Sequence, residues 1–215
     1  MNGIRFGAYH SFDDLQLVLS KKEMGSPAIK KNKLDIPGAD SAIDQTDFFG
    51  EPKYEDVDHR FTFTSTLPHS AFLDQHSRIK NAIHGKRLKI ILDDDPAFFY
   101  VGRCDVSGFT SEKGVGTVVV TCDCNPYKYK QELTTVTMAI DGIETLTLTN
   151  GRKRAVPEVT ITTGTTMRIT YQGVNVWDLG SGSYTLPELE LVEGDNAVEV
   201  SGTGTISFAW QWGDM

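Results

Sequence analysis

Short stretches in which apolar and polar residues alternate run through most of the sequence. The alternation is clear in residues 59–65 (HRFTFTS), and an apolar run at 116–122 (GTVVVTC) has the length of a strand. A period of two places every second side chain on the same face of a strand, so these stretches predict β-structure with one buried face. The strands expected in the first part of the chain are 15–19, 59–65, 88–92, 98–101 and 116–122.

Only residues 68–84 have the spacing of an α-helix. Apolar or semi-polar positions recur there every three or four residues, and Gly85 follows as a helix stop. We expect His76 to lie within this stripe as a hydrogen-bonded core histidine. The predicted buried stripe consists of Phe72, His76, Ile79 and Ile83, with Leu73 beside it.

After residue 130 strand-like runs follow one another about every ten residues, separated by glycines. This rhythm predicts an antiparallel β-sandwich. The expected strands are 136–140, 146–148, 159–161, 167–171, 189–191, 197–200 and 206–212.

The segment between the first two predicted strands is different in kind. Residues 21–33 are charged and contain Gly-Ser-Pro, which favours a loop or a hairpin arm. Residues 34–50 are acidic and rich in turn-forming residues, yet they carry the adjacent aromatics Phe48 and Phe49. An exposed aromatic pair on a loop needs a partner surface, so this segment is predicted to reach a neighbouring molecule.

Composition supports a folded chain with two domains. Of 215 residues, 39% are hydrophobic and 23% charged, which is enough for a core. The net charge of −8 argues against a globally basic nucleic-acid-binding surface. Residues 1–130 carry 17 basic and 18 acidic side chains, whereas residues 131–215 carry 4 and 11. This break predicts a linker at 126–130 and domains 1–130 and 131–215.

Neither a membrane span nor a secretory signal is expected, because no window holds about 18 consecutive apolar residues and the N-terminus lacks a basic-then-apolar layout. We therefore expect a product of the cytosol.

The residues that carry chemistry form no catalytic pattern. Cys104, Cys122 and Cys124 cannot all pair within one chain, and we expect them to be reduced, half-buried structural residues. Cys122 and Cys124 could supply half of a zinc site, but no second ligand pair is evident. The acidic run 93–95 before Pro96 is expected to form a hairpin turn. No metal, cofactor or enzymatic activity is predicted.

Aromatic residues in the second half allow two interpretations. They could stack on sugars, or they could fill the core of the sandwich, and the core is favoured because Trp210 and Trp212 share a strand face with apolar neighbours. These aromatic residues are Trp177, Tyr184, Trp210 and Trp212.

The order of several short segments resembles the distal tail proteins of siphophages, over nearly the whole chain. The N-terminal half of that family is resembled by residues 7–15 (GAYHSFDDL), 36–40 (IPGAD) followed by Asp44, 60–63, 85–88, 93–102 (DDDPAFFYVG) and 124–129 (CNPYKY). The C-terminal domain of the family is resembled by residues 150–151, 157–161 and 191–202.

The resemblance implies a mainly β protein with an N-terminal β-sandwich or barrel-like ring domain carrying one α-helix, followed by a C-terminal galectin-like β-sandwich. It implies a structural role at the virion tail tip as a homohexameric ring. The implied partners are the tail tube, the tape-measure protein, the tail-associated lysin or fibre hub and the receptor-binding protein, with DNA only passing through the lumen. The candidate oligomerisation residues are Pro37, Gly38, Asp44, Phe48 and Phe49.

Two departures from the family pattern concern sugar binding. Residues 210–215 (WQWGDM) lack the basic residue that many relatives have before the final glycine, and the long insertions that carry carbohydrate-binding modules are missing. Direct binding to host sugars is therefore not expected. The alternatives are a carbohydrate-binding module, which needs exposed coplanar aromatics, and an enzyme, which needs the His69 and His76 region to converge with residues 93–95.

Overall fold

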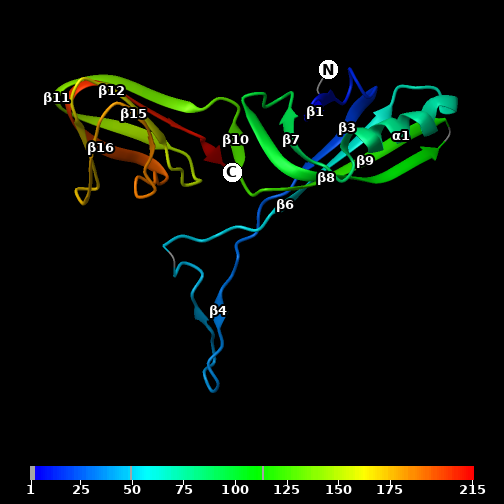
Figure 1. Ribbon diagram of the computed structural model, residues 1–215. Coiled ribbons are helices and arrows are strands. Elements are labelled where there is room, and N and C mark those ends of the chain that lie inside the picture. Colours follow the sequence, from blue (N-terminus) through cyan, green and yellow to red (C-terminus); the bar gives the residue numbers. More distant parts are fainter. Residues whose placement is uncertain (1–2, 49, 113) are drawn as a thin grey trace. The chain divides into compact units, whose positions relative to one another are not determined.

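The structure is a computed structural model that describes residues 3–48, 50–112 and 114–215 (Figure 1). Strands dominate, and the described residues contain one α-helix, which confirms the predicted mainly β fold class. The chain forms two compact units, Met1–Pro126 (unit 1) and Tyr127–Met215 (unit 2). Each unit has its own cluster of buried apolar side chains.

Unit 1 is built on an antiparallel sheet in the order β2-β1-β7-β8-β9-β6-β3. The predicted alternation is visible in β6, where Phe61 and Phe63 are fully buried and Thr62 between them is not. The strands of this sheet are β1 (Ile4–Phe6), β2 (Tyr9–His10), β3 (Leu17–Met24), β6 (Val57–Ser65), β7 (Arg87–Leu92), β8 (Phe98–Glu112) and β9 (Val115–Cys124).

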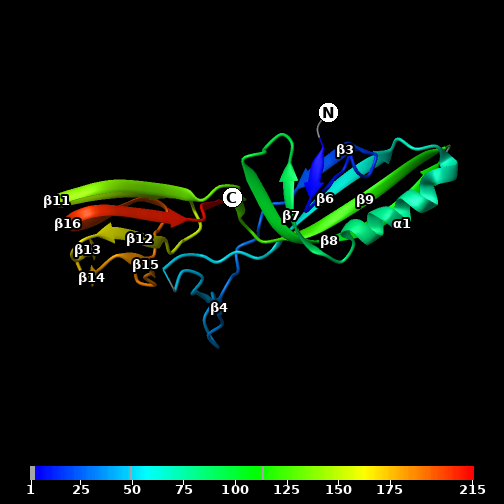
Figure 2. The same ribbon diagram turned by 45° about the horizontal axis from the view of Figure 1, so that its top comes forward.

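The predicted helix is present as the short 3-10 turn η1 (His69–Ala71) followed by α1 (Phe72–Ile83). Helix α1 lies alongside β8 and β9 (Figures 1 and 2), and its residues Ile79, Ala82 and Ile83 enter the core of unit 1. Gly85 follows with φ of 73°, the left-handed conformation expected of a helix stop.

Two positions of the predicted helical stripe are wrong. His76 is only half-buried and stacks on Phe109, with ring centroids 4.4 Å apart, and Leu73 is 76% exposed. The buried polar position is Gln75, one residue earlier. The reason is that the loop after β2 folds against α1, and the amide at position 75 donates to its main-chain carbonyls of Leu15 and Gln16.

Between β3 and β6 the chain leaves the sheet as a long hairpin, residues 25–56, which we call the arm (Figure 1). Its two sides are joined by main-chain hydrogen bonds from Lys30 N–H to Lys53 O and from Gln45 N–H to Asn32 O. Near the tip the short strands β4 (Lys33–Leu34) and β5 (Ile43–Asp44) pair.

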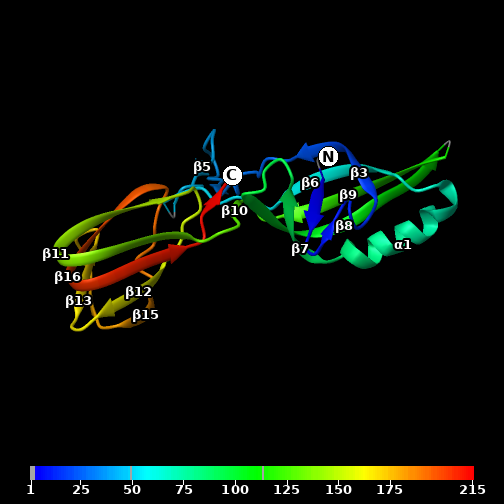
Figure 3. The same cartoon turned by 90° about the horizontal axis from the view of Figure 1, so that it is seen from above.

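Unit 2 contains a six-stranded antiparallel sheet organised around β16. Strand β11 pairs with β16 along its whole length, while β12 and β13 pair with different halves of β16 on its other edge. Figure 3 shows β11 and β16 running side by side. The strands are β11 (Thr134–Asn150), β12 (Glu158–Thr163), β13 (Met167–Tyr171), β14 (Asn175–Leu179), β15 (Gly182–Thr185) and β16 (Gly194–Trp210).

The predicted strands of unit 2 need three corrections. Segments 136–140 and 146–148 are one strand, because Gly142 adopts a φ of 104° opposite Gly202 and bends the ladder without breaking it. Segments 197–200 and 206–210 likewise merge into β16, and residues 211–212 of the predicted last strand lie beyond its end. Residues 189–191 form no strand but a single bridge from Leu191 to Ala155, although Leu189 and Leu191 are buried.

The residues expected to form a linker are structured. Strand β10 (Lys128–Lys130) pairs with the C-terminal strand β17 (Gly213–Asp214), and the side-chain amide of Gln211 donates to Lys130 O at 2.7 Å. Residues 127–130 therefore pack with unit 2, and the division between the units falls at Pro126.

Candidate assembly surface

The arm exposes apolar side chains along its length. None of the described residues of the arm belongs to either core cluster. A hairpin without a core beneath it gains little from burial within its own chain, so its apolar area is available to a partner. Within the part of the arm that the structure describes, the exposed large apolar residues are Ile29, Leu34, Ile36, Ile43 and Phe48.

Two of the predicted site residues form the turn at the tip of the arm. Pro37 and Gly38 are the central residues of a β-turn closed by a hydrogen bond from Ala39 N–H to Ile36 O at 3.1 Å. Gly38 has a φ of 87°, which a type II turn requires at this position, and Pro37 supplies the fixed φ before it. These residues shape the hairpin and expose Ile36 beside the turn.

Asp44 lies in β5 and organises the returning side of the arm. Its carboxylate accepts a hydrogen bond from Thr46 N–H at 2.9 Å. Hydrogen bonds from the Thr46 side chain and main chain hold the pKa of Asp44 below its usual value. Asp44 is therefore a turn-stabilising anion with its side chain in solvent.

Among the described aromatic residues of the arm, Phe48 is the most exposed, at 73%. It sits in a turn closed by a hydrogen bond from its own N–H to Gln45 O at 3.1 Å. Its neighbour Phe49, the other predicted contact, lies outside the described residues. Phe48 is thus placed where a neighbouring molecule can cover it.

The root of the arm is fixed to the sheet by a buried histidine. His59 on β6 is 2% exposed, and its Nδ1 accepts a hydrogen bond from Gly25 N–H at 3.2 Å. An added Cβ at Gly25 would approach Asp58 O to 2.5 Å, so glycine is required where the arm begins. Burial lowers the pKa of His59, and the nearby Asp58 opposes that shift. The neutral imidazole is therefore the form that holds Gly25.

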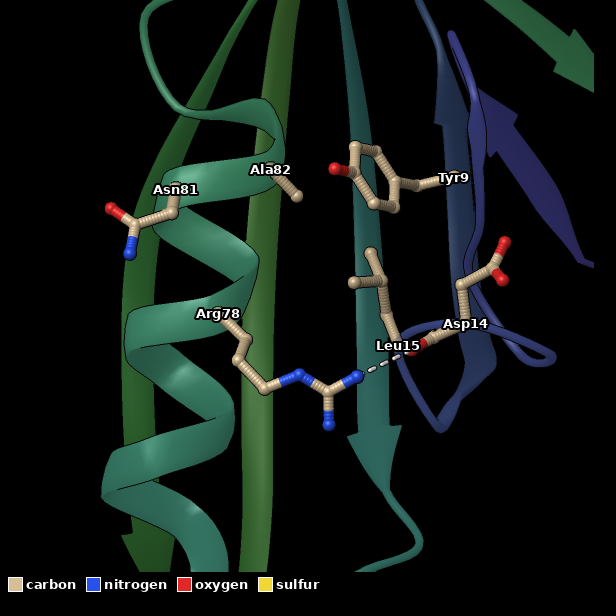
Figure 4. Close-up of a pocket in the computed structure, with 6 residues that line it drawn as sticks. All are labelled: Tyr9, Asp14, Leu15, Arg78, Asn81 and Ala82. Carbon is tan, nitrogen blue, oxygen red and sulfur yellow. Dashed lines mark hydrogen bonds between the residues drawn. The ribbon is translucent and has the colours of Figure 1, made fainter.

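A hollow of about 330 Å³ lies between α1 and the loop after β2. In Figure 4 the ring of Tyr9 and the side chain of Leu15 face the helix, while Asn81 points away from them. The Arg78 guanidinium reaches across and donates to Asp14 O at 3.1 Å. We call this hollow, lined by Tyr9, Asp14, Leu15, Arg78, Asn81 and Ala82, the helix groove.

The helix groove is suited to an acidic, partly apolar guest. The Asp14 carboxylate turns back to its own loop and accepts from His10 N–H at 2.6 Å. Among the described residues no carboxylate forms an ion pair with Arg78. Its guanidinium donates to the main-chain carbonyl of Asp14, which carries no net charge. A guest carboxylate would add a charge-assisted hydrogen bond there.

The aromatic residues of unit 2 form no exposed platform. Trp210 is 2% exposed and donates from its indole nitrogen to the buried Asn150 Oδ1 at 3.0 Å. Trp177 and Tyr184 pack against the core, and Trp212 lies beneath the Lys130 ammonium, 3.9 Å from its ring centroid. The prediction of a core role is confirmed for Trp210. None of these four side chains presents a flat, open aromatic face on which a sugar could stack.

The structure separates the groups that an active site would have to bring together. Asp93 bonds Gly3 N–H at 2.7 Å and faces His10, and Asp94 pairs with Lys22, so the predicted turn at 93–95 anchors the N-terminal strands. His69 instead contacts Ser111. Within the described ranges no group of three or more His, Cys, Asp or Glu side chains is arranged to hold a metal ion, and no helix has the length and apolar character to span a bilayer.

Sequence reasoning missed the length of the arm and the whole helix groove. Ile29 and Leu34 extend the apolar surface beyond the aromatic pair, and only their exposure in the folded chain identifies them. Arg78 is ordinary in sequence, because its importance depends on the loop around Asp14 folding back onto α1. The spacing within α1 carries no signal of that contact.

Comparisons with known proteins give one kind of match. No protein-family model and no curated protein matches the sequence. Among solved structures, the chain is similar to the SPP1 Dit (gp 19.1) protein, described as a paradigm of the hub adsorption apparatus in phages that infect Gram-positive bacteria. The match covers 99% of both chains with a TM-score of 0.73 and 14% sequence identity. The chain therefore has, over its full length, the fold of the SPP1 Dit protein.

Proposed function

We propose that this protein is a structural hub of a siphophage tail tip, a distal tail protein that assembles as a closed ring. The observation that carries the proposal is the full-length match to SPP1 Dit, in which both units align within one comparison. The family resemblance of the sequence points to the same class of protein independently of that match. The function is to hold other proteins in place and involves no reaction.

The arm supports a ring of identical subunits, with six as the expected number. A contact in which the arm of one copy reaches a different surface of the next copy is head-to-tail, and such contacts must close into a ring or continue as a filament. Between Lys33 and Lys53 the arm has only acidic charges. The carboxylates of this stretch are Asp35, Asp40, Asp44, Asp47 and Glu51.

The helix groove of the neighbouring copy fits this arm by charge and by chemistry. Arg78 offers a cation to the acidic arm, and Tyr9 and Leu15 offer apolar area to side chains such as Ile36 or Phe48. Arg78→Glu should then weaken the ring. Lys80→Glu, the same charge change at an exposed position on the same helix, is the matched control and should leave the ring intact.

The remaining partners follow from the proposed position at the tail tip. One face of the ring would join the tail tube and the tape-measure protein, and the other would join the tail-associated lysin or fibre hub and the receptor-binding protein. Unit 2 carries most of the net negative charge, and mutual repulsion favours keeping six such units apart at the rim. DNA would pass through the lumen without specific contacts.

Negative-stain microscopy of the purified full-length protein tests the proposal. We expect closed rings with a central hole and six-fold averages. Particles that stay single at high micromolar concentration, with or without the tail tube protein, would overturn it. Open filaments would keep the head-to-tail contact but contradict the closed ring.

A further inference from the structure

The three cysteines lie together on the buried face of two neighbouring strands. Cys104 on β8 stands directly opposite Cys122 on β9 in the ladder, and both are fully buried. The Cys122 thiol donates toward Cys104, with the two Sγ atoms 2.9 Å apart. The third cysteine, Cys124, faces Gly102 instead of another cysteine, and nothing in the proposed function uses the Cys104–Cys122 pair.

The hydrogen bonds of Cys104 show which kind of cross-strand pair this is. Its N–H donates to Lys86 O at 2.9 Å, and its carbonyl accepts from Gly85 N–H at 2.7 Å. Both main-chain groups therefore point away from β9, and Cys104 and Cys122 form a non-hydrogen-bonded pair. The Cα atoms of such pairs are about 4.5 Å apart, within the range that a disulfide spans.

Cys124 is excluded from this pairing by its own position. It stands opposite Gly102, where an added Cβ would collide with the Cys124 sulfur. Its separation from Cys122 along the strand is about 6.6 Å between Cα atoms, at the upper end of disulfide geometry. Burial also raises the pKa of the Cys124 thiol to about 12, which keeps it protonated.

We propose that Cys104 and Cys122 are a latent disulfide site, reduced when the protein is made and oxidised after it leaves the cell. With hydrogen peroxide as oxidant, the first sulfur attacks one peroxide oxygen and the O–O bond breaks. The other peroxide oxygen leaves as the first water, which takes the proton of the attacking thiol. The second sulfur attacks the resulting sulfenic acid, the S–O bond breaks, and a second water leaves. Two thiols and one hydrogen peroxide thus give one disulfide and two waters.

The burial of both sulfurs and the redox state of the compartment together determine when the disulfide forms. The cytosol keeps thiols in the reduced state, whereas the medium outside the cell does not. The neighbouring Cys104 and the apolar surroundings raise the pKa of Cys122, so reactive thiolate is scarce and oxidation is slow. Only a small oxidant reaches sulfurs with no exposed surface. The bond would close residues 105–121 into a loop and fix β8 to β9. Cys122 also pairs with His59 on β6, so the bond would lie beside the residue that fixes the root of the arm.

Thiol counting on the folded full-length protein tests the site. After treatment with hydrogen peroxide, quenching and denaturation, the count should fall from three to one, with an intact mass lower by two hydrogen atoms. The midpoint of thermal unfolding should rise by about 5 °C or more and return on addition of dithiothreitol.

Single variants separate this bond from its competitors, each checked for folding by circular dichroism. Cys124→Ala should still lose two thiols, whereas Cys104→Ala and Cys122→Ala should lose none. Three thiols remaining in the treated protein would overturn the site. So would two thiols lost in Cys104→Ala, a gain of oxygen mass instead of a loss of hydrogen, or a covalent dimer on a non-reducing gel.

Discussion

At the scale of single residues, Gln75 and His76 show how a tertiary contact decides which helix position is buried. The Gln75 amide donates to Leu15 O at 2.8 Å and Gln16 O at 3.2 Å, and its oxygen accepts from Ser65. His76 has only a partly covered ring stacked on Phe109. The helical period identified the correct side of α1, but the buried polar residue was determined by a loop 60 positions away in sequence.

We predict that Gln75→Ala destabilises unit 1 by about 2–3 kcal/mol, because two carbonyls and one hydroxyl lose their partner in a buried place. His76→Ala should cost about 1 kcal/mol or less, since it removes one side of a half-exposed stack. Urea unfolding of the two variants measures the difference. Equal losses of unfolding free energy in the two variants would indicate that His76 is a core residue and would contradict the importance of the hydrogen bonds of Gln75.

His59 predicts how stability depends on pH. Its pKa in the folded protein lies below the usual 6.5, so below pH 6.5 the unfolded chain takes up a proton that the folded chain does not. The stabilisation is therefore fully present above pH 6.5 and is lost as the pH falls toward the lowered pKa. The urea midpoint of unit 1 should decrease between pH 7 and pH 5.5.

His59→Asn is the matched variant for this prediction, because its side-chain oxygen can still accept from Gly25 N–H but does not titrate. Its urea midpoint should vary less over the same pH interval, with the smaller residual slope attributable to His76, whose pKa burial also lowers. An unchanged slope in His59→Asn would show that His59 is not the group responsible.

At the scale of elements, the sequence predicted where strands run better than where they stop. Alternation located the paired cores of β6 and β9, because a sheet face must be apolar on one side. It divided β11 at Asp141 and Gly142, where glycine resembles a turn signal but instead allows a continuous strand to bend opposite Gly202. A pattern of residue types cannot distinguish those two uses of glycine.

The strands β10 and β17 predict the limits of an independently folding fragment. Residues 127–215 retain the β10–β17 pair and the bond from Gln211 to Lys130 O, whereas residues 131–215 lose both and expose Trp212. The longer fragment should unfold cooperatively at a midpoint several degrees higher. Calorimetry of the two fragments measures this, and identical midpoints would show that β10 contributes nothing to unit 2.

At the scale of the whole molecule, the sequence indicated an assembly surface but not its complement. Phe48 could be identified because an aromatic residue in an acidic, turn-rich segment has no strand to pack into. The helix groove could not, since Tyr9, Leu15 and Arg78 converge only after the chain has folded. A ring needs both the arm and the helix groove, so the mass of the oligomer depends on both surfaces.

Light scattering of the unmodified protein, Phe48→Ser and Val174→Ser at equal concentration measures directly whether the arm assembles the ring. Val174 is an apolar residue of unit 2 that is 81% exposed, against 73% for Phe48, so it controls for loss of surface hydrophobicity alone. We predict six times the chain mass of 23.8 kDa for the unmodified protein and Val174→Ser, and a folded monomer for Phe48→Ser. A monomeric unmodified protein, or an unchanged hexamer in Phe48→Ser, would contradict assembly through the arm.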